Sequence, residues 1–126
     1  MMQIIVAGRA LNALPAFIKA IEENNTRVMG VDNGKDAIRA VSEENFDLLI
    51  ADESLGDMSG IRLIENVISR NPMLNCAVVS SLPPDEFHEA SEGLGILMPL
   101  PIKPGQEEAD ALMNHLKKIQ SFKVGS

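Results

Sequence analysis

Residues of three chemical kinds stand where apolar, strand-like segments run into loops. Asp52 ends the segment FDLLIAD, Ser80 lies near the end of CAVVSS, and Lys103 follows ILMPLPI. In an open parallel sheet, ligands and reactive groups gather beyond the carboxyl ends of the strands. A carboxylate, a hydroxyl and an amine from three separate strands are therefore expected at one edge of the sheet.

The elements that must position these residues follow from the periodicity of the chain. Short apolar runs alternate with longer segments of helical period, which is typical of a parallel sheet with helices on both faces. The short runs predict strands at residues 3–7, 27–31, 46–52, 76–81 and 96–102. The periodic segments predict helices at residues 11–24, 35–45, 60–70, 83–93 and 105–120. We predict an α/β fold with a single domain over residues 1–126, because the length leaves no room for a second domain.

Prolines refine two of these elements. Pro99 and Pro101 lack amide donors, so the last predicted strand cannot be central and should lie at an edge of the sheet. Pro15 is expected in the first turn of the first helix, where a missing amide costs nothing.

Composition excludes several classes of function. The net charge of −7 disfavours binding to nucleic acid or to an anionic membrane surface, since both reward clusters of Lys and Arg. Cys76 is the only cysteine, so neither an internal disulfide nor a cysteine-based zinc site can form, and we expect it to fill the core. No basic leader and no apolar run of membrane-spanning length is present. We therefore expect a cytoplasmic protein whose partners are proteins or small cations.

The ordered set of strand-end motifs resembles the receiver domains of two-component response regulators over nearly the whole chain. In that family an aspartate closing the third strand accepts a phosphoryl group, and a glycine opens the next helix, here Asp52 and Gly60. A Ser or Thr closes the fourth strand, here Ser80, and a Lys-Pro pair, typically joined by a cis bond, follows the fifth, here Lys103 and Pro104. The resemblance implies a flavodoxin-like, doubly wound parallel sheet in the order 2-1-3-4-5.

The roles that the resemblance implies agree with phosphoryl chemistry. A carboxylate can act as a nucleophile toward phosphorus, and the charge that develops on the phosphoryl oxygens needs fixed cations and hydrogen-bond donors. Lys103 would provide the cation and Ser80 the donor.

The first strand departs from the family. Receivers end that strand with adjacent acids that hold Mg²⁺ together with the phosphoacceptor, whereas this chain has Ala7, Gly8 and Arg9 there. Mg²⁺ is usually held by one or two carboxylates and the substrate phosphate, so Asp52 would have to bind it without help from the first strand. We therefore expect a pseudo-receiver, with no dedicated metal site and Mg²⁺ bound weakly at best.

The residues of the family's switch depart as well. An aromatic residue often stands three positions before the lysine, and here that position is Leu100. The loop after the fourth predicted strand contains Pro83 and Pro84, which restrict its backbone. Switching by the family's usual route is expected to be impaired.

Simpler structural roles stay open for each of these residues. Asp52 could cap loop amides, Ser80 could be an ordinary hydroxyl at the core edge, and Lys103 could form a structural ion pair with Asp52. Arg9 could neutralise Asp52, and if cations replace the metal the pKa of Asp52 should be lowered. His88 and His115 are expected at the surface.

Our preferred interpretation is a regulatory domain that is not an enzyme and acts through protein contacts, with phosphorylation lost or weakened. Its partner would be a histidine kinase or a downstream regulator, and the segments 83–93, 96–102 and 105–120 match the family's usual output and dimer surface. One alternative is a working phosphoacceptor that recruits Mg²⁺ through Asp52, Glu53 or Asp57. Another is a small-molecule binder that uses the strand-end cleft, although the sequence contains no cofactor motif.

Overall fold

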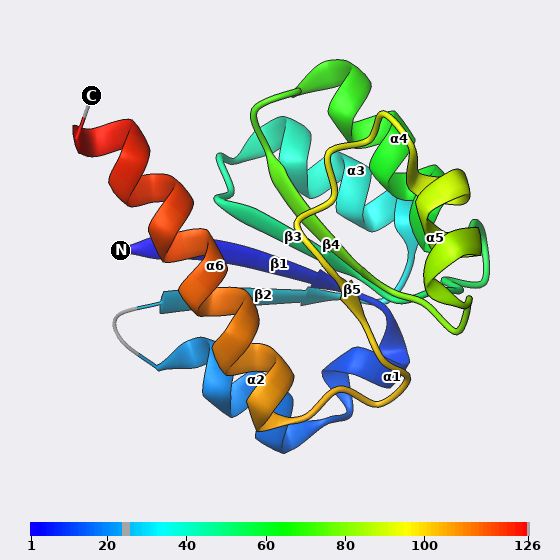
Figure 1. Cartoon of the computed structure of the whole chain (residues 1–126), viewed down its shortest axis with the longest axis horizontal. Coiled ribbons are helices and arrows are strands. Elements are labelled where there is room, and N and C mark those ends of the chain that lie inside the picture. Colours follow the sequence, from blue (N-terminus) through cyan, green and yellow to red (C-terminus); the bar gives the residue numbers. More distant parts are fainter. Residues whose placement is uncertain (24–25, 126) are drawn as a thin grey trace.

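Five parallel strands form one sheet at the centre of the computed structural model, which describes residues 1–23 and 26–125 (Figure 1). The strands are β1 (Met2–Ala7), β2 (Thr26–Val31), β3 (Leu48–Ala51), β4 (Asn75–Val79) and β5 (Pro99–Leu100). Their order is β2-β1-β3-β4-β5, and all four pairings are parallel. The predicted flavodoxin-like fold and its strand order are confirmed.

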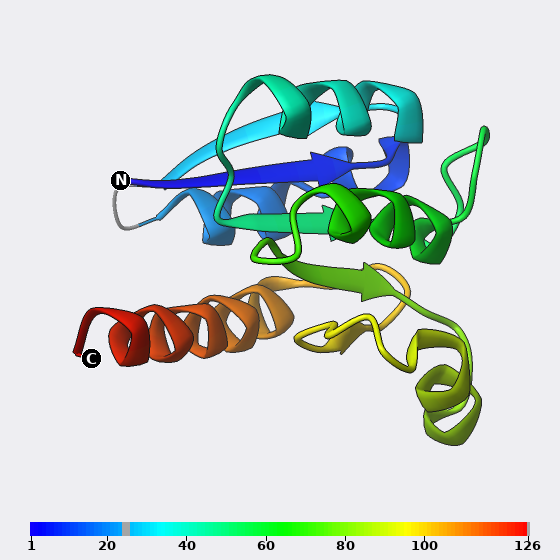
Figure 2. The ribbon, with the colours of Figure 1, turned by 90° about the horizontal axis from the view of Figure 1, so that it is seen from above.

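Helices cover both faces of this sheet (Figure 2). They are α1 (Arg9–Asn12), α2 (Pro15–Glu22), α3 (Gly34–Glu43), α4 (Gly60–Arg70), α5 (Pro84–Ser91) and α6 (Gln106–Gly125). Buried residues of α1, α2 and α6 share one apolar cluster, and those of α3, α4 and α5 share the other. The two clusters lie on opposite faces, so the sheet is covered on both sides.

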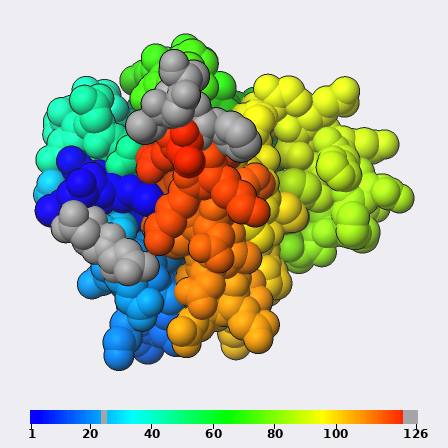
Figure 3. Space-filling view, turned by 60° about the vertical axis from the view of Figure 1, so that its left-hand side comes forward, coloured from blue at the N-terminus to red at the C-terminus, as the bar shows by residue number. Residues whose placement is uncertain are grey.

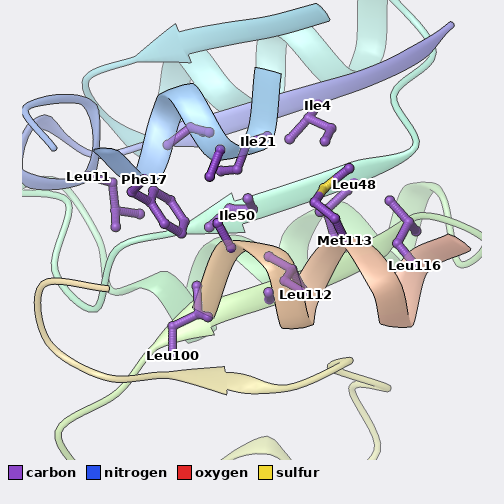
Figure 4. Close-up of a cluster of buried hydrophobic side chains, with 14 of the residues drawn as sticks. Ile4, Leu11, Phe17, Ile21, Leu48, Ile50, Leu100, Leu112, Met113 and Leu116 are labelled. Carbon is purple, nitrogen blue, oxygen red and sulfur yellow. The ribbon is translucent and has the colours of Figure 1, made fainter. Parts of the chain in front are cut away.

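The third strand shows how the sequence builds both clusters. Leu48 and Ile50 contribute to the cluster with α2 and α6, whereas Leu49 and Ala51 contribute to the opposite one. Successive side chains of a strand point to opposite faces, so a continuous apolar run is what a strand buried on both faces requires. Figure 4 shows Leu48 and Ile50 packed among side chains of α2 and α6 in the first cluster.

The first predicted helix is interrupted in the structure. Residues 11–24 were expected to form one helix, but α1 ends at Asn12 and α2 begins at Pro15, with Leu14 in an extended conformation. A residue before proline is disfavoured in the helical region, so the chain leaves the helix there and restarts at the proline. Pro15 lies in the first turn as predicted, and the predicted end of this helix at residue 24 lies outside the described residues.

The last strand is short and lies at the sheet edge, as the prolines predicted. β5 has two residues, Pro99 and Leu100, where the prediction gave residues 96–102. Pro99 and Pro101 cannot donate to a strand ladder, which limits the length of the pairing. The Leu100 side chain is buried, and its carbonyl accepts a 2.9 Å hydrogen bond from the Ser80 amide.

Helix α5 projects at one side of the molecule (Figure 2), and its atoms lie at the right of the space-filling view (Figure 3). Phe87 is its buried residue.

None of the helices in the described ranges combines the length and the apolar composition needed to cross a bilayer.

Candidate functional site

Asp52 lies directly beyond β3, at the carboxyl edge of the sheet. Its amide donates a 2.9 Å hydrogen bond to the carbonyl of Ala7 at the end of β1, which fixes the carboxylate beside the β1 terminus. The Asp52 side chain is half-buried, and its Oδ1 accepts a 2.8 Å hydrogen bond from the amide of Glu53. This local bond is the cap that the simpler interpretation of Asp52 predicted, and it leaves Oδ2 facing Gly8.

Gly8 brings the main chain of the β1–α1 junction against Asp52. A Cβ atom placed on Gly8 would lie 2.6 Å from Asp52 Cβ and 3.2 Å from Asp52 Oδ2. The φ angle of Gly8 is 125°, a conformation that residues with a side chain rarely adopt. Both the close approach and the backbone angle therefore require glycine at this position.

Gly60 likewise allows a close approach to Asp52, here by the first residue of α4. A Cβ atom on Gly60 would overlap the carbonyl oxygen of Asp52 and would lie 2.8 Å from Val78 Cγ2. The Gly60 amide donates a 3.0 Å hydrogen bond to the Glu53 carbonyl. The first residue of α4 thus packs directly on the main chain of the candidate site.

Glu53 links the loop after β3 to the loop after β4. Its Oε1 accepts hydrogen bonds from both the amide and the hydroxyl of Ser81, at 2.8 Å and 2.7 Å. These two bonds lower the pKa of Glu53, with a smaller opposing effect from burial. No sequence pattern predicts this contact, because it joins two loops that only the tertiary fold brings together.

Ser80 lies at the same carboxyl edge of the sheet, and its hydroxyl oxygen binds an amide of the loop after β4. Its Oγ accepts a 3.1 Å hydrogen bond from the amide of Leu82, a local turn contact typical of serine. The half-buried Ser80 hydroxyl thus acts as an acceptor in this contact, which leaves its hydrogen available to a second partner.

Lys103 follows β5 and does not form an ion pair with Asp52. Its side chain is exposed, and no pairing of these two residues within 4.0 Å occurs in the described part of the chain. Lys103 has a φ of 57°, and its bond to the buried Pro104 is trans, in contrast to the cis form that the resemblance implies. The structure thus brings Asp52 and Ser80 to one edge, with Lys103 turned to solvent.

Arg9 does not neutralise Asp52. Its Nε lies 4.0 Å from Asp32 Oδ2, and both side chains are well exposed, at 86% and 63% of their surface. The hypothesis that the Arg9 guanidinium neutralises Asp52 is therefore wrong in this structure. An exposed pair of this kind contributes little to stability.

The prediction of a lowered pKa for Asp52 is also wrong. Burial raises the pKa of Asp52 above its ordinary value of 3.8, the Glu53 amide opposes this by hydrogen bonding, and the negative charge of Glu53 raises it further. The expected lowering required nearby cations, and neither candidate, Arg9 or Lys103, forms an ion pair with Asp52.

Asp57 caps the helix that follows β2. Its two carboxylate oxygens accept hydrogen bonds from the amides of Gly34 and Lys35, at 2.9 Å and 3.0 Å. These amides belong to the first turn of α3, where negative charge is favourable. The hydrogen bond from Gly34 is the main cause that lowers the pKa of Asp57.

The acids around Asp52 do not fit a Mg²⁺ ion held by several carboxylates. Gly8 has no side chain, and Glu53 and Asp57 are both bound to main-chain donors. Within residues 1–23 and 26–125, no group of three or more His, Cys, Asp or Glu side chains is placed to hold a metal ion. At the end of β1, Ala7, Gly8 and Arg9 supply no carboxylate that could join Asp52 in holding the ion.

Comparison with known proteins identifies a family. A model of the response regulator receiver domain matches residues 10–98, which is more than half of the chain and includes Asp52 and Ser80. The matched segment begins after Ala7, Gly8 and Arg9, and it ends before Lys103. No curated protein matches the sequence.

Several solved structures share the fold at low sequence identity. The signal receiver domain of a putative LuxO repressor protein from Vibrio parahaemolyticus has a TM-score of 0.84 and 14% identity, over 99% of this chain and 97% of that one. The chemotaxis response regulator CheY4 of Vibrio cholerae has a TM-score of 0.80 and 14% identity, over 92% and 98%. A streptococcal redox sensor described as evolved from response regulators has a TM-score of 0.83 and 14% identity, over all of this chain and 56% of that one. The fold, the strand-end residues and the matching model agree, and the chain belongs to the response regulator receiver domain family.

Proposed function

We propose that this chain is a regulatory receiver domain, not an enzyme, in which Mg²⁺-dependent phosphorylation of Asp52 is lost or much weakened. The domain acts through contacts with a protein partner such as a histidine kinase or a downstream regulator. The observation that carries this proposal is the close approach of Gly8 to Asp52, with the Gly8 main chain beside the carboxylate where receivers carry metal-binding acids.

The magnitude of the effect follows from the electrostatics of phosphoryl transfer. A bound metal ion contributes several kcal/mol of charge stabilisation in the transition state, and each loss of about 1.4 kcal/mol slows a reaction about tenfold. Neither Lys103 nor Arg9 forms an ion pair with Asp52 that could replace this charge. We therefore expect Asp52 to be phosphorylated orders of magnitude more slowly than in a receiver with intact acids.

A surface groove supports action through protein contacts. It has a volume of about 730 Å³ and lies between α5 and the segment that leads into β5, with Phe87, Met98 and Leu100 among its lining residues. Leu82, which also lines the groove, keeps 42% of its surface exposed, and Ile102, just beyond the lining residue Pro101, keeps 53%. The lining includes Ser80 but neither Asp52 nor Lys103, so the groove is not centred on the three strand-end residues together.

Intact-mass measurement after incubation with acetyl phosphate and Mg²⁺ tests the proposal. The expected result is an unmodified protein under conditions that fully phosphorylate an ordinary receiver run in parallel. The proposal fails if the protein gains the mass of one phosphoryl group and Asp52→Asn abolishes that gain. Such a result would favour the alternative of a working phosphoacceptor.

A further inference from the structure

The junction between β1 and α1 is held by hydrogen bonds from the Asn12 side chain to main-chain carbonyls, together with main-chain hydrogen bonds of Gly8 and Asn12. The Asn12 side-chain nitrogen lies within hydrogen-bond distance of three carbonyl oxygens, those of Val6 at 3.1 Å, Gly8 at 2.9 Å and Val31 at 3.2 Å. The amide of Gly8 donates to the Val31 carbonyl at 2.9 Å, and the amide of Asn12 donates to the Gly8 carbonyl at 3.2 Å. One carboxamide thus ties together the ends of β1 and β2 and the first turn of α1.

The fold makes room for this carboxamide at a second glycine. A Cβ atom on Gly30 would lie 2.5 Å from Asn12 Oδ1 and 3.0 Å from Asn12 Cγ. Gly30 is paired with Val6 in the β1–β2 register, so it faces the point where Asn12 crosses from α1 onto the sheet. Asn12 is therefore fitted between the two strand ends.

The three positions where an acid could be restored each present a different obstacle. Ala7 is fully buried in the apolar cluster with α3 and α4, where a carboxylate would lose its hydration. Gly8 has no space for a Cβ beside Asp52, and its φ of 125° disfavours any side chain. Arg9 is solvent-facing beside Asp32, away from the site.

We propose that Asn12 is a positioning residue that holds the Gly8 main chain against Asp52, so that the backbone itself closes this side of Asp52 to a metal ligand. This inference rests on the proposed function and extends it. The course of the main chain at the β1–α1 junction prevents a metal site beside Asp52. Replacing one residue by an acid therefore does not restore such a site.

The first test compares Gly8→Asp with Gly56→Asp in the full chain. Gly56 also has a positive φ, of 86°, but a Cβ there would meet nothing within 4 Å, so Gly56→Asp controls for adding an aspartate at a positive-φ glycine without a steric contact. We expect Gly8→Asp to lower the melting temperature more than Gly56→Asp. We also expect MgCl₂ to stabilise neither variant more than it stabilises the wild type.

A restored metal site would stabilise Gly8→Asp by an amount that can be calculated. A restored site with a dissociation constant of about 1 mM would raise the folding constant about 20-fold in about 20 mM MgCl₂. A gain of this kind in Gly8→Asp, absent from Gly56→Asp and from the wild type, would overturn the inference. It would leave the proposed function intact, because that proposal concerns the wild-type protein in the acetyl phosphate assay.

The second test uses Asn12→Ala and does not depend on the stability of Gly8→Asp. If Asn12 holds Gly8 against Asp52, its removal should relax the burial that raises the pKa of Asp52, and carboxyl NMR should show that pKa moving toward 3.8. In a double-mutant cycle, Gly8→Asp should also cost less in the Asn12→Ala background than in the wild type, because the junction can then move. An unchanged Asp52 titration with purely additive losses would show that Asn12 is structural only.

Discussion

The contact of Glu53 with Ser81 makes a quantitative prediction about the loop network around Asp52. In Glu53→Gln the side chain keeps an oxygen that can accept from the Ser81 amide and hydroxyl, but it loses its negative charge. Hydrogen bonds to charged groups contribute about 1.5–3 kcal/mol and neutral ones about 0.5–1.5 kcal/mol. Since this contact is open to solvent, the lower end applies, and we expect a loss of about 1 kcal/mol at neutral pH.

The stability lost in Glu53→Gln should depend on pH. The Ser81 bonds lower the pKa of Glu53 below its ordinary value of 4.5, so the folded state favours the charged form. The contribution is fully present above pH 4.5 and disappears as the pH falls through the lower folded value. The deficit of Glu53→Gln should therefore be largest near pH 7 and should shrink toward pH 3.

Chemical denaturation at several pH values measures this deficit, with Glu65→Gln as the matched control. Glu65 is exposed on α4, and its side chain makes no hydrogen bond or ion pair within the described residues. For a domain of this size, a loss of about 1 kcal/mol corresponds to a fall of roughly 3–6 °C in melting temperature. If Glu53→Gln and Glu65→Gln have the same stability at every pH, the two Ser81 bonds contribute nothing and the reasoning is refuted.

Three further predictions concern neighbouring residues. Because burial raises the pKa of Asp52, its charge opposes folding above that pKa, so Asp52→Asn should be slightly more stable than wild type at pH 7, by less than about 1 kcal/mol; a lower melting temperature would contradict this. Gly60→Ala should lose about 1–3 kcal/mol in urea denaturation, because its Cβ overlaps the main chain of Asp52. Gly105→Ala is the control, since its Cβ would meet only an oxygen at 3.6 Å, and equal stabilities would argue against the overlap. Burial raises the pKa of Cys76 to about 12, so iodoacetamide at pH 8 should label it only after unfolding, and fast labelling of the native protein would contradict its burial.

The fold could be predicted from the sequence because its signals are local. The helix at residues 60–70 has the same bounds in the structure, since its start at Gly60 and its stop before Asn71 and Pro72 are visible in the chain. The edge position of β5 followed from two prolines that cannot join a ladder. The interruption at Leu14 was missed because the apolar period continues across it, although the following Pro15 disfavours a helical Leu14.

The candidate site was predictable only in part. The placement of Asp52 and Ser80 at the ends of strands follows from the parallel topology. The contacts of Asn12 and of Glu53 could not be predicted, since each joins a side chain to atoms from a distant part of the chain. The predicted direction of the Asp52 pKa shift was wrong for the same reason. The shift depends on whether Arg9 and Lys103 lie close to Asp52, and their presence in the sequence does not show this.

The claim that Asp52 lacks a metal site can be tested most directly by titrating the wild-type protein with MgCl₂ and following its backbone amides by NMR. The site described above predicts small shifts, linear in Mg²⁺ and spread over the acidic surface, with no saturation at the amides of Gly8, Asp52 and Glu53. Saturating shifts centred on these three amides, and absent from Asp52→Asn, would contradict it.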